Sequence, residues 1–139
     1  MTLEATGTAE ALLIARTLFA AVLGYLALGN LLDLSGAIDY AASKGAPLPR
    51  LLVPATSFAL LAGAAAILIG AYPALGAITI LAFFIGVTPV MHDFWNETGM
   101  QRDNEEYHFL KNVGLAAGAM VFLALSATTW PYALGIGLW

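Results

Sequence analysis

The chain has 139 residues, of which 60% are hydrophobic and 10% are charged, against about 45–50% and 25% in an average soluble domain. Its mean hydropathy is +0.84, and a soluble core of this length could not bury so much apolar surface. The nine Asp and Glu against five Lys and Arg exclude a basic nucleic-acid surface, and the lack of cysteine excludes disulfides and thiolate chemistry. The composition therefore predicts an integral membrane protein.

Four stretches are long and apolar enough to cross a membrane, which requires about 20 mostly apolar residues. They are residues 11–32, 51–72, 73–91 and 109–129. The N-terminal "MTLEATGTAE" has no basic segment, so the first stretch is expected to be a true span rather than a cleaved signal peptide. Together they predict an all-α, integral membrane four-helix bundle that forms one domain over residues 1–139.

The connections differ in length and character. Pro73 suits the first turn of a helix, so the second and third spans should form a tight hairpin. The first connection is long, and its "GAIDYAAS" predicts a short interfacial helix that "KGAPLP" ends. Residues 92–107 are expected to be a polar, acidic loop, which is compatible with a high-salt, archaeal halophile source.

Small and aromatic residues predict how the spans pack and where the chain ends. Gly114 and Gly118 form a small-residue pair, which lets helices approach closely in lipid, so a compact bundle is expected. The tail "WPYALGIGLW" is too short to span, and Trp130, Tyr132 and Trp139 predict an interfacial anchor.

Arg16 is the most costly residue in the first span, because an arginine at the bilayer centre costs roughly 2.5–3.5 kcal/mol. It either snorkels to the near interface or is a fixed cation that pairs with a carboxylate or a ligand anion. At the far end of this span, Tyr25, Asn30 and Asp33 are either capping and interface residues or part of a binding site.

Lys44 and the "HDFWN" segment form the next group of candidate residues. Lys44 lies in the first connection beside rigid turns and is either solvated or part of a site. His92, Asp93 and Trp95 close the third span, as interfacial residues or as a proton carrier beside a carboxylate with an aromatic ring that stacks on a flat ligand.

The fourth span begins with three polar residues, His108, Lys111 and Asn112. They either mark the start of the helix or belong to a site. His108 and Asn112 are four residues apart and share a helix face, and a lysine over a pocket could hold an oxyanion or polarise a carbonyl oxygen. The two histidines, His92 and His108, have no third ligand at a helpful spacing, so no metal site is expected.

The chain resembles the DoxX family of small four-helix membrane proteins. The resemblance rests on "ARTLFAAVLGYLALGNLLDL", "YAASKGAPLP", "GAAAILIGAYPALGA", "HDFW" and "FLKN", in that order and spacing. It implies a membrane bundle linked to quinone-dependent or redox-stress functions, similar to the DoxD-type subunits of thiosulfate:quinone oxidoreductase. The residues that it carries over are Arg16, Lys44, Gly45, Pro47, His92, Phe109, Lys111 and Asn112.

Two features complicate the resemblance. Ala59 stands where the family commonly has a glutamate in the second helix, which puts a direct catalytic role in doubt. The family also implies that both termini are cytoplasmic, whereas the Lys and Arg residues lie near the two long connections and favour the opposite orientation. The family orientation is preferred here, since Lys44 and Lys111 are candidate site residues.

The sequence thus predicts a quinone- or redox-linked subunit of a membrane oxidoreductase system, with a polar pocket at one membrane face and no covalently bound cofactor. The expected ligand-binding residues are Arg16, Lys44, His92, Trp95, Lys111 and Asn112, with Asn30, Asp33, Asp93 and His108 as secondary candidates. The alternatives are a non-catalytic scaffold that holds a soluble oxidoreductase through its acidic loop, and a bundle that handles small solutes or lipids. The expected partners are the bilayer, an oxidoreductase and further copies of the chain.

Overall fold

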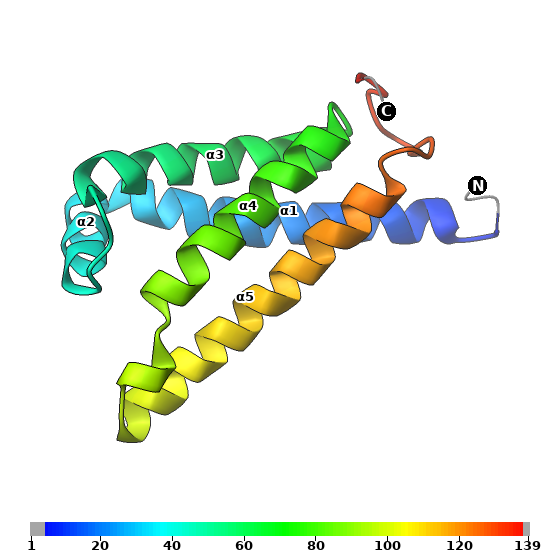
Figure 1. Cartoon of the computed structure of the whole chain (residues 1–139). Coiled ribbons are helices and arrows are strands. Elements are labelled where there is room, and N and C mark those ends of the chain that lie inside the picture. Colours follow the sequence, from blue (N-terminus) through cyan, green and yellow to red (C-terminus); the bar gives the residue numbers. More distant parts are fainter. Residues whose placement is uncertain (1–4, 138–139) are drawn as a thin grey trace.

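The computed structural model describes residues 5–137, and every regular element in that part of the chain is a helix (Figure 1). In chain order these are α1 (Thr8–Leu32), α2 (Leu34–Ser43), α3 (Pro49–Ile69), α4 (Pro73–Met91), the 3₁₀ helix η1 (Phe94–Asn96) and α5 (Gly99–Leu125). Four of them, α1, α3, α4 and α5, are long and apolar enough to cross a membrane. The all-α, four-span prediction is therefore confirmed.

The helices form two antiparallel pairs that meet at an angle (Figure 1). α1 packs against α3, α4 packs against α5, and the pairs are joined through α3 and α4. The pairs converge at the end that holds both described termini and the α3–α4 turn, here named the terminal end. They diverge toward α2, η1 and the start of α5, here named the loop end. The expected compact bundle is thus closed at one end and open at the other.

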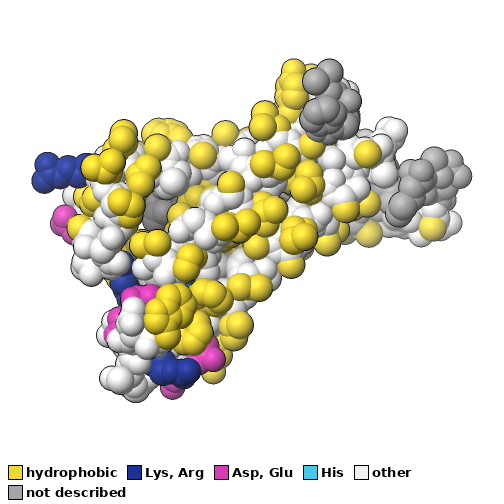
Figure 2. All heavy atoms as spheres, viewed as in Figure 1, with side chains coloured by type: hydrophobic (Ala, Val, Ile, Leu, Met, Phe, Trp, Pro, Cys, Tyr) yellow, Lys and Arg dark blue, Asp and Glu magenta, His cyan; other side chains and the backbone are white. Residues whose placement is uncertain are grey.

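The apolar core lies where the helix pairs converge. Leu23, Leu60, Ile67 and Ile80 are fully or almost fully buried there. Outside the core, large apolar side chains remain exposed along the spans, and charged side chains gather at the loop end (Figure 2). This distribution fits a chain whose solvent along the spans is lipid, where backbone groups must be paired inside helices.

Glycines allow neighbouring helices to pack closely at two contacts. A Cβ atom on Gly118 would lie 2.9 Å from the ring of Phe19, so this position lets α5 approach the Phe19 ring of α1, whereas Gly114 faces open space. Between α3 and α4, a Cβ atom on Gly76 would lie 2.8 Å from the Cβ atom of Ala66 and 3.1 Å from the carbonyl oxygen of Gly63. These two backbones therefore touch with no room for side chains.

The α3–α4 hairpin is as tight as expected, although α3 ends at Ile69 rather than at residue 72. Gly70 has a φ of +65° and stops α3 in the left-handed conformation that glycine adopts without strain. Pro73 then occupies the first turn of α4, and this helix has the predicted bounds of 73–91.

The predicted acidic loop over 92–107 is wrong for most of its length. α5 begins at Gly99 instead of residue 109, because its charged first turns can form a helix supported by the Arg102–Glu106 pair, in which Nη1 and Oε2 are 2.9 Å apart. α5 also ends at Leu125 rather than 129, where the hydroxyls of Ser126 and Thr128 donate to carbonyls of the last turn. The long helix places the start of α5 beyond the apolar span.

The C-terminal tail folds back over the terminal end. The backbone N–H groups of Leu134 and Gly135 donate to Ile69 and Gly70, and that of Tyr72 donates to Ile136. Trp130 is buried instead of lying at the interface as predicted, and its indole N–H donates to the carbonyl of Leu125 at 2.9 Å. Tyr132 is exposed, and Trp139 lies outside the described residues. The tail is therefore a cap on the bundle.

The glycine contact in the α3–α4 hairpin gives a first prediction. Gly76→Leu should lower the stability of the bundle by about 1–3 kcal/mol, because the new side chain must push apart two backbones. Thermal unfolding in detergent, followed by size-exclusion chromatography, measures this loss. Gly114→Leu is the matched control, since its side chain enters open space. Equal melting temperatures for the two variants would show that the hairpin is not closely packed.

Candidate functional site

The charged residues of the loop end are brought together by α2. Asp33 caps this helix through its Oδ1 atom, which accepts from the N–H of Gly36 at 3.2 Å. Tyr40 and Lys44 lie four residues apart and therefore share a face of the helix end. Gly45, with a φ of +74°, turns the chain away toward α3 and leaves the Lys44 side chain directed at the other helix pair.

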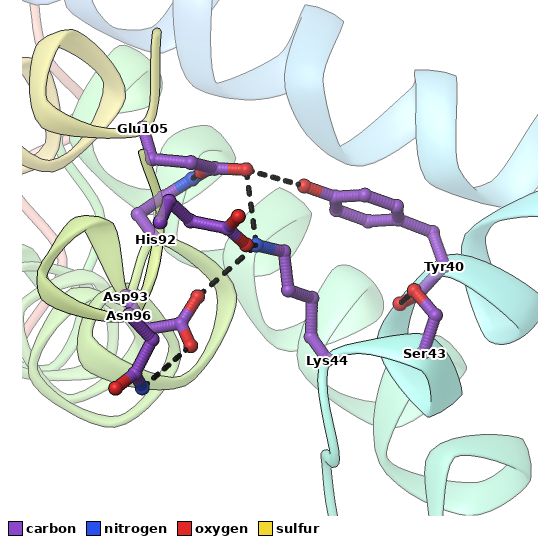
Figure 3. Close-up of polar contacts among 8 residues, drawn as sticks. Tyr40, Ser43, Lys44, His92, Asp93, Asn96 and Glu105 are labelled. Atoms are coloured by element: carbon purple, nitrogen blue, oxygen red, sulfur yellow. Dashed lines mark hydrogen bonds and ion pairs between the residues drawn. The ribbon is translucent and has the colours of Figure 1, made fainter. Parts of the chain in front are cut away.

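Lys44 binds three carboxylates from the α4–α5 region (Figure 3). Its Nζ atom is 3.0 Å from Asp93 and 3.1 Å from both Glu97 and Glu105, and its side chain is only 8% exposed. Asn96 further fixes Asp93 by donating to its second carboxylate oxygen at 3.0 Å. The ammonium group thus joins α2 to the end of α4, to η1 and to α5.

Glu105 is the most connected of these carboxylates, and it is buried. Its Oε1 atom accepts from the hydroxyl of Tyr40 at 3.1 Å and from Lys44, while its Oε2 atom lies 2.7 Å from Nδ1 of His92 (Figure 3). A buried carboxylate requires such partners, because desolvation otherwise penalises its charge. The set Tyr40, Lys44, His92, Asp93, Glu97 and Glu105 is named the Lys44 network.

The network changes the pKa values of its α2 members. Burial alone would lower the pKa of Lys44, but hydrogen bonds to the three carboxylates outweigh it and raise the pKa above the ordinary 10.5. The lysine therefore stays charged at every pH below 10.5, and its own titration removes stabilisation only as the pH rises through the raised pKa. Burial and the hydrogen bond to Glu105 also raise the pKa of Tyr40, so its hydroxyl keeps its proton.

The network continues toward the surface through the second histidine. The rings of His92 and His108 stack with centroids 5.2 Å apart and planes at 19°, and Nδ1 of His108 is 3.4 Å from Nζ of Lys111. His108 and Lys111 are exposed, so the network reaches the surface of the molecule at this end. His92 is intermediate, with a side chain that is 17% exposed.

Other residues predicted for the site lie apart from the network. Asn112 is buried, but it faces α4 and lines a separate cavity with Thr88 and Phe109. Trp95 is half-exposed, and its ring packs nearly perpendicular to those of Phe94 and Phe109. The structure therefore brings Lys44, His92, Asp93, His108 and Lys111 into one chain of contacts and leaves Asn112 and Trp95 outside it.

Arg16 lies in the first half of α1 and contacts the tail at the terminal end, whereas the Lys44 network lies at the loop end. It is fully buried, and its Nη2 atom donates to the carbonyl oxygens of Pro131 and Tyr132 in the tail. Its guanidinium carbon lies 6.0 Å from the ring centroid of Trp130. Arg16 does not snorkel, and it pairs with no carboxylate among residues 5–137. It holds the tail against the bundle, so the expected pocket does not include it.

An apolar cavity of about 280 Å³ opens between the diverging helix pairs beside the Lys44 network. Its polar wall residues are Asn30 of α1, Tyr40 of α2 and Thr56 of α3. The amide of Asn30 also donates to Ser57 at 3.3 Å, which ties α1 to α3. Apolar side chains make up the rest of the wall, chiefly Leu52, Val53, Phe83, Val87, Val90 and Met91. This space is named the loop-end cavity.

Sequence reasoning missed Tyr40 as a site residue and placed Glu105 in a loop. Both carried a periodic signal, since Tyr40 lies one turn before Lys44 and Glu105 lies three residues before His108. The spacing of Glu105 and His108 predicts a shared helix face only if the helix starts before residue 105. Among residues 5–137, no group of three or more His, Asp or Glu side chains is arranged to hold a metal ion.

Four apolar spans, with charges gathered beyond them, define a multi-pass integral membrane protein. The family model for DoxX matches residues 11–93. The inner membrane protein YphA of Escherichia coli (strain K12) is 31% identical over 117 residues, which cover 83% of this chain and 81% of that protein. The chain therefore belongs to the DoxX family, as its motifs predicted. No solved structure gives a significant match.

The family match includes one side of the Lys44 network. Lys44, His92 and Asp93 lie within the matched residues 11–93, whereas Glu97 and Glu105 follow them. The matched segment thus supplies the cation and the histidine, and the region after it supplies the central carboxylate.

Loss of the lysine charge gives the second prediction. Lys44→Met should destabilise the protein by about 3–5 kcal/mol at neutral pH, because it leaves clustered carboxylates without their cation. The loss should shrink as the pH falls toward values at which carboxylates take up protons. Thermal unfolding in detergent across a pH series measures both effects. Arg50→Met, at an exposed position, is the control, and a Lys44 variant as stable as this control would contradict the network's role.

Proposed function

We propose that this DoxX-family protein is a quinone-linked subunit of a membrane oxidoreductase system and that the loop-end cavity holds the quinone ring. The observation that supports the proposal is an apolar cavity of about 280 Å³ directly beside a hydrogen-bonded network of titratable groups. Ligand pockets usually combine a mostly apolar wall with a few placed polar groups. A cavity of about 150 Å³ already takes benzene, so this one has room for a substituted ring whose tail lies in lipid.

Proton exchange is the second reason for a quinone rather than an inert lipid. Interconversion of quinone and quinol moves protons together with electrons, and Tyr40, Glu105 and His92 form a hydrogen-bonded chain from the cavity wall toward exposed His108. Histidine exchanges protons near neutral pH. The electrons must come from or go to a partner oxidoreductase, which is why a subunit is proposed rather than a complete enzyme.

The family resemblance supports a cytoplasmic location for both termini. Four spans place the two ends of the chain on the same side of the membrane, so the loop end with the Lys44 network would face the opposite side. Asp39 of α2 and the exposed charges in the first turns of α5 would then lie in the aqueous phase outside the cytoplasm.

Filling the cavity tests the proposed function. Gly86 lines the loop-end cavity, and a Cβ atom on it would meet nothing within 4 Å, so Gly86→Leu should occupy the cavity without a clash. The variant should lose most of the quinone that is extracted from natively purified protein and quantified by mass spectrometry. Gly114→Leu, whose side chain also enters open space but away from the cavity, should keep it. Equal quinone in both variants, or none in the wild type, would contradict the proposal.

The scaffold function is a second candidate, favoured by the length of α5. The first turns of α5 present exposed Asp103 and partly exposed Glu106 beyond the apolar span, whereas Glu105 is occupied by the Lys44 network. The paired substitution Asp103→Asn and Glu106→Gln should detach a co-purifying flavin- or haem-containing oxidoreductase while leaving bound quinone unchanged. Glu10→Gln, at an exposed position of the terminal end, is the control. Retention of the oxidoreductase by the paired variant would exclude this docking surface.

A further inference from the structure

Each polar side chain around the loop-end cavity donates a hydrogen bond to another group of the protein. The hydroxyl of Tyr40 donates to Glu105 at 3.1 Å, and the hydroxyl of Thr56 donates to the carbonyl of Leu52 at 2.6 Å. The amide nitrogen of Asn30 donates to Ser57 at 3.3 Å. These three residues come from three different helices, so the shared pattern is a property of the cavity rather than of one element.

The acceptors on the other side of these bonds cannot reverse them. An ionised carboxylate and a backbone carbonyl have no proton to donate, so the protons of Tyr40 and Thr56 stay directed away from a ligand. A hydroxyl has one proton and two acceptor lone pairs. Tyr40 and Thr56 therefore offer acceptors to the cavity, and Asn30 adds its carbonyl oxygen and one remaining N–H. The polar wall is dominated by acceptors.

Lys44 helps to keep the Tyr40 proton directed at Glu105, because it stabilises the charged form of that carboxylate. It lies 3.1 Å from the same Oε1 atom that accepts from Tyr40, and His92 occupies the other oxygen of Glu105. Both contacts favour the charged carboxylate. A charged acceptor also forms a stronger hydrogen bond than a neutral one, so a ligand carbonyl would compete poorly for the Tyr40 proton.

We propose that the loop-end cavity binds the reduced, hydroxyl-bearing quinol in preference to the oxidised quinone. This inference rests on the proposed function and adds to it the redox form that the site recognises. A quinol donates its O–H to the free lone pair of the Tyr40 hydroxyl, whereas a quinone oxygen, itself an acceptor, would face an acceptor there and finds a donor only in the remaining N–H of Asn30. No electron or covalent bond moves in this binding step.

The expected selectivity follows from one neutral hydrogen bond that the quinol makes and the quinone cannot. Such a bond is worth about a three- to tenfold difference in affinity. The probes are duroquinol, duroquinone and the dimethyl ether of duroquinol, which share the substituted ring and differ in their donors. Equilibrium dialysis against purified full-length protein in detergent, without oxygen, should give about three- to tenfold tighter binding of duroquinol than of the other two.

Two substitutions assign the preference to the hydroxyl of Tyr40. Tyr40→Phe removes the acceptor while leaving the Lys44–Glu105 ion pair in place, and it should reduce the quinol preference by about three- to tenfold. Glu105→Ala releases the Tyr40 proton toward the cavity, so it should tighten duroquinone binding and also narrow the preference. Tyr25→Phe and Glu10→Ala, which alter exposed residues that do not line the cavity, should keep the wild-type ratio.

The outcomes separate this inference from the proposed function. Equal binding of duroquinol and duroquinone by the wild type, or an unchanged preference in Tyr40→Phe, would overturn the inference and leave a quinone site standing. Binding of neither ring would overturn both. If Glu105→Ala does not fold, the Tyr40→Phe comparison still decides, since that variant keeps the ion pairs of Lys44 intact.

Discussion

The bridge between Lys44 and its three carboxylates is the interaction on which the loop end of this protein depends. The two helix pairs diverge there, so apolar packing cannot hold α2 against α4 and α5. An ammonium group with partners on η1, on α5 and at the end of α4 spans that gap instead. Buried ion pairs add little to stability on balance, because desolvation offsets attraction, but they are specific in geometry. The network therefore sets the separation of the helix pairs.

The cavity and the network are two results of the same geometry. Divergence of the helix pairs leaves space between Phe83, Val87 and Leu52, and the network closes that space at its polar end through Tyr40. A ligand ring would thus meet an apolar wall on most sides and hydrogen-bonding groups on one. Glu105 links the two parts, since its carboxylate fixes both the position of Lys44 and the direction of the Tyr40 hydroxyl.

The sequence predicted the spans better than the site, for physical reasons. Hydropathy and Pro73 define α4 at its observed bounds, and "GAIDYAAS" predicts α2, because these signals are local. Lys44 and His92 stand out as polar residues beside apolar spans. Glu105 does not, since "RDNEEYH" has the composition of a loop and becomes helical as a continuation of α5.

Adjacent polar residues can also differ in burial, and their polarity alone does not predict which one is exposed. Lys111 is exposed and Asn112 is buried, because successive positions on a helix are rotated by about 100°. Both were expected in one pocket. The depth of Arg16 in its span was evident from sequence, but its partners were not, since they lie in a turn with no periodic pattern that could predict contact with α1.

The distance along the chain between Arg16 and its partners has a consequence for biogenesis. The guanidinium belongs to α1, yet the carbonyls that it binds lie 115 and 116 positions later, after α5. During synthesis α1 is therefore made before the partners of Arg16, and this contact forms only after α5 and the tail have been translated.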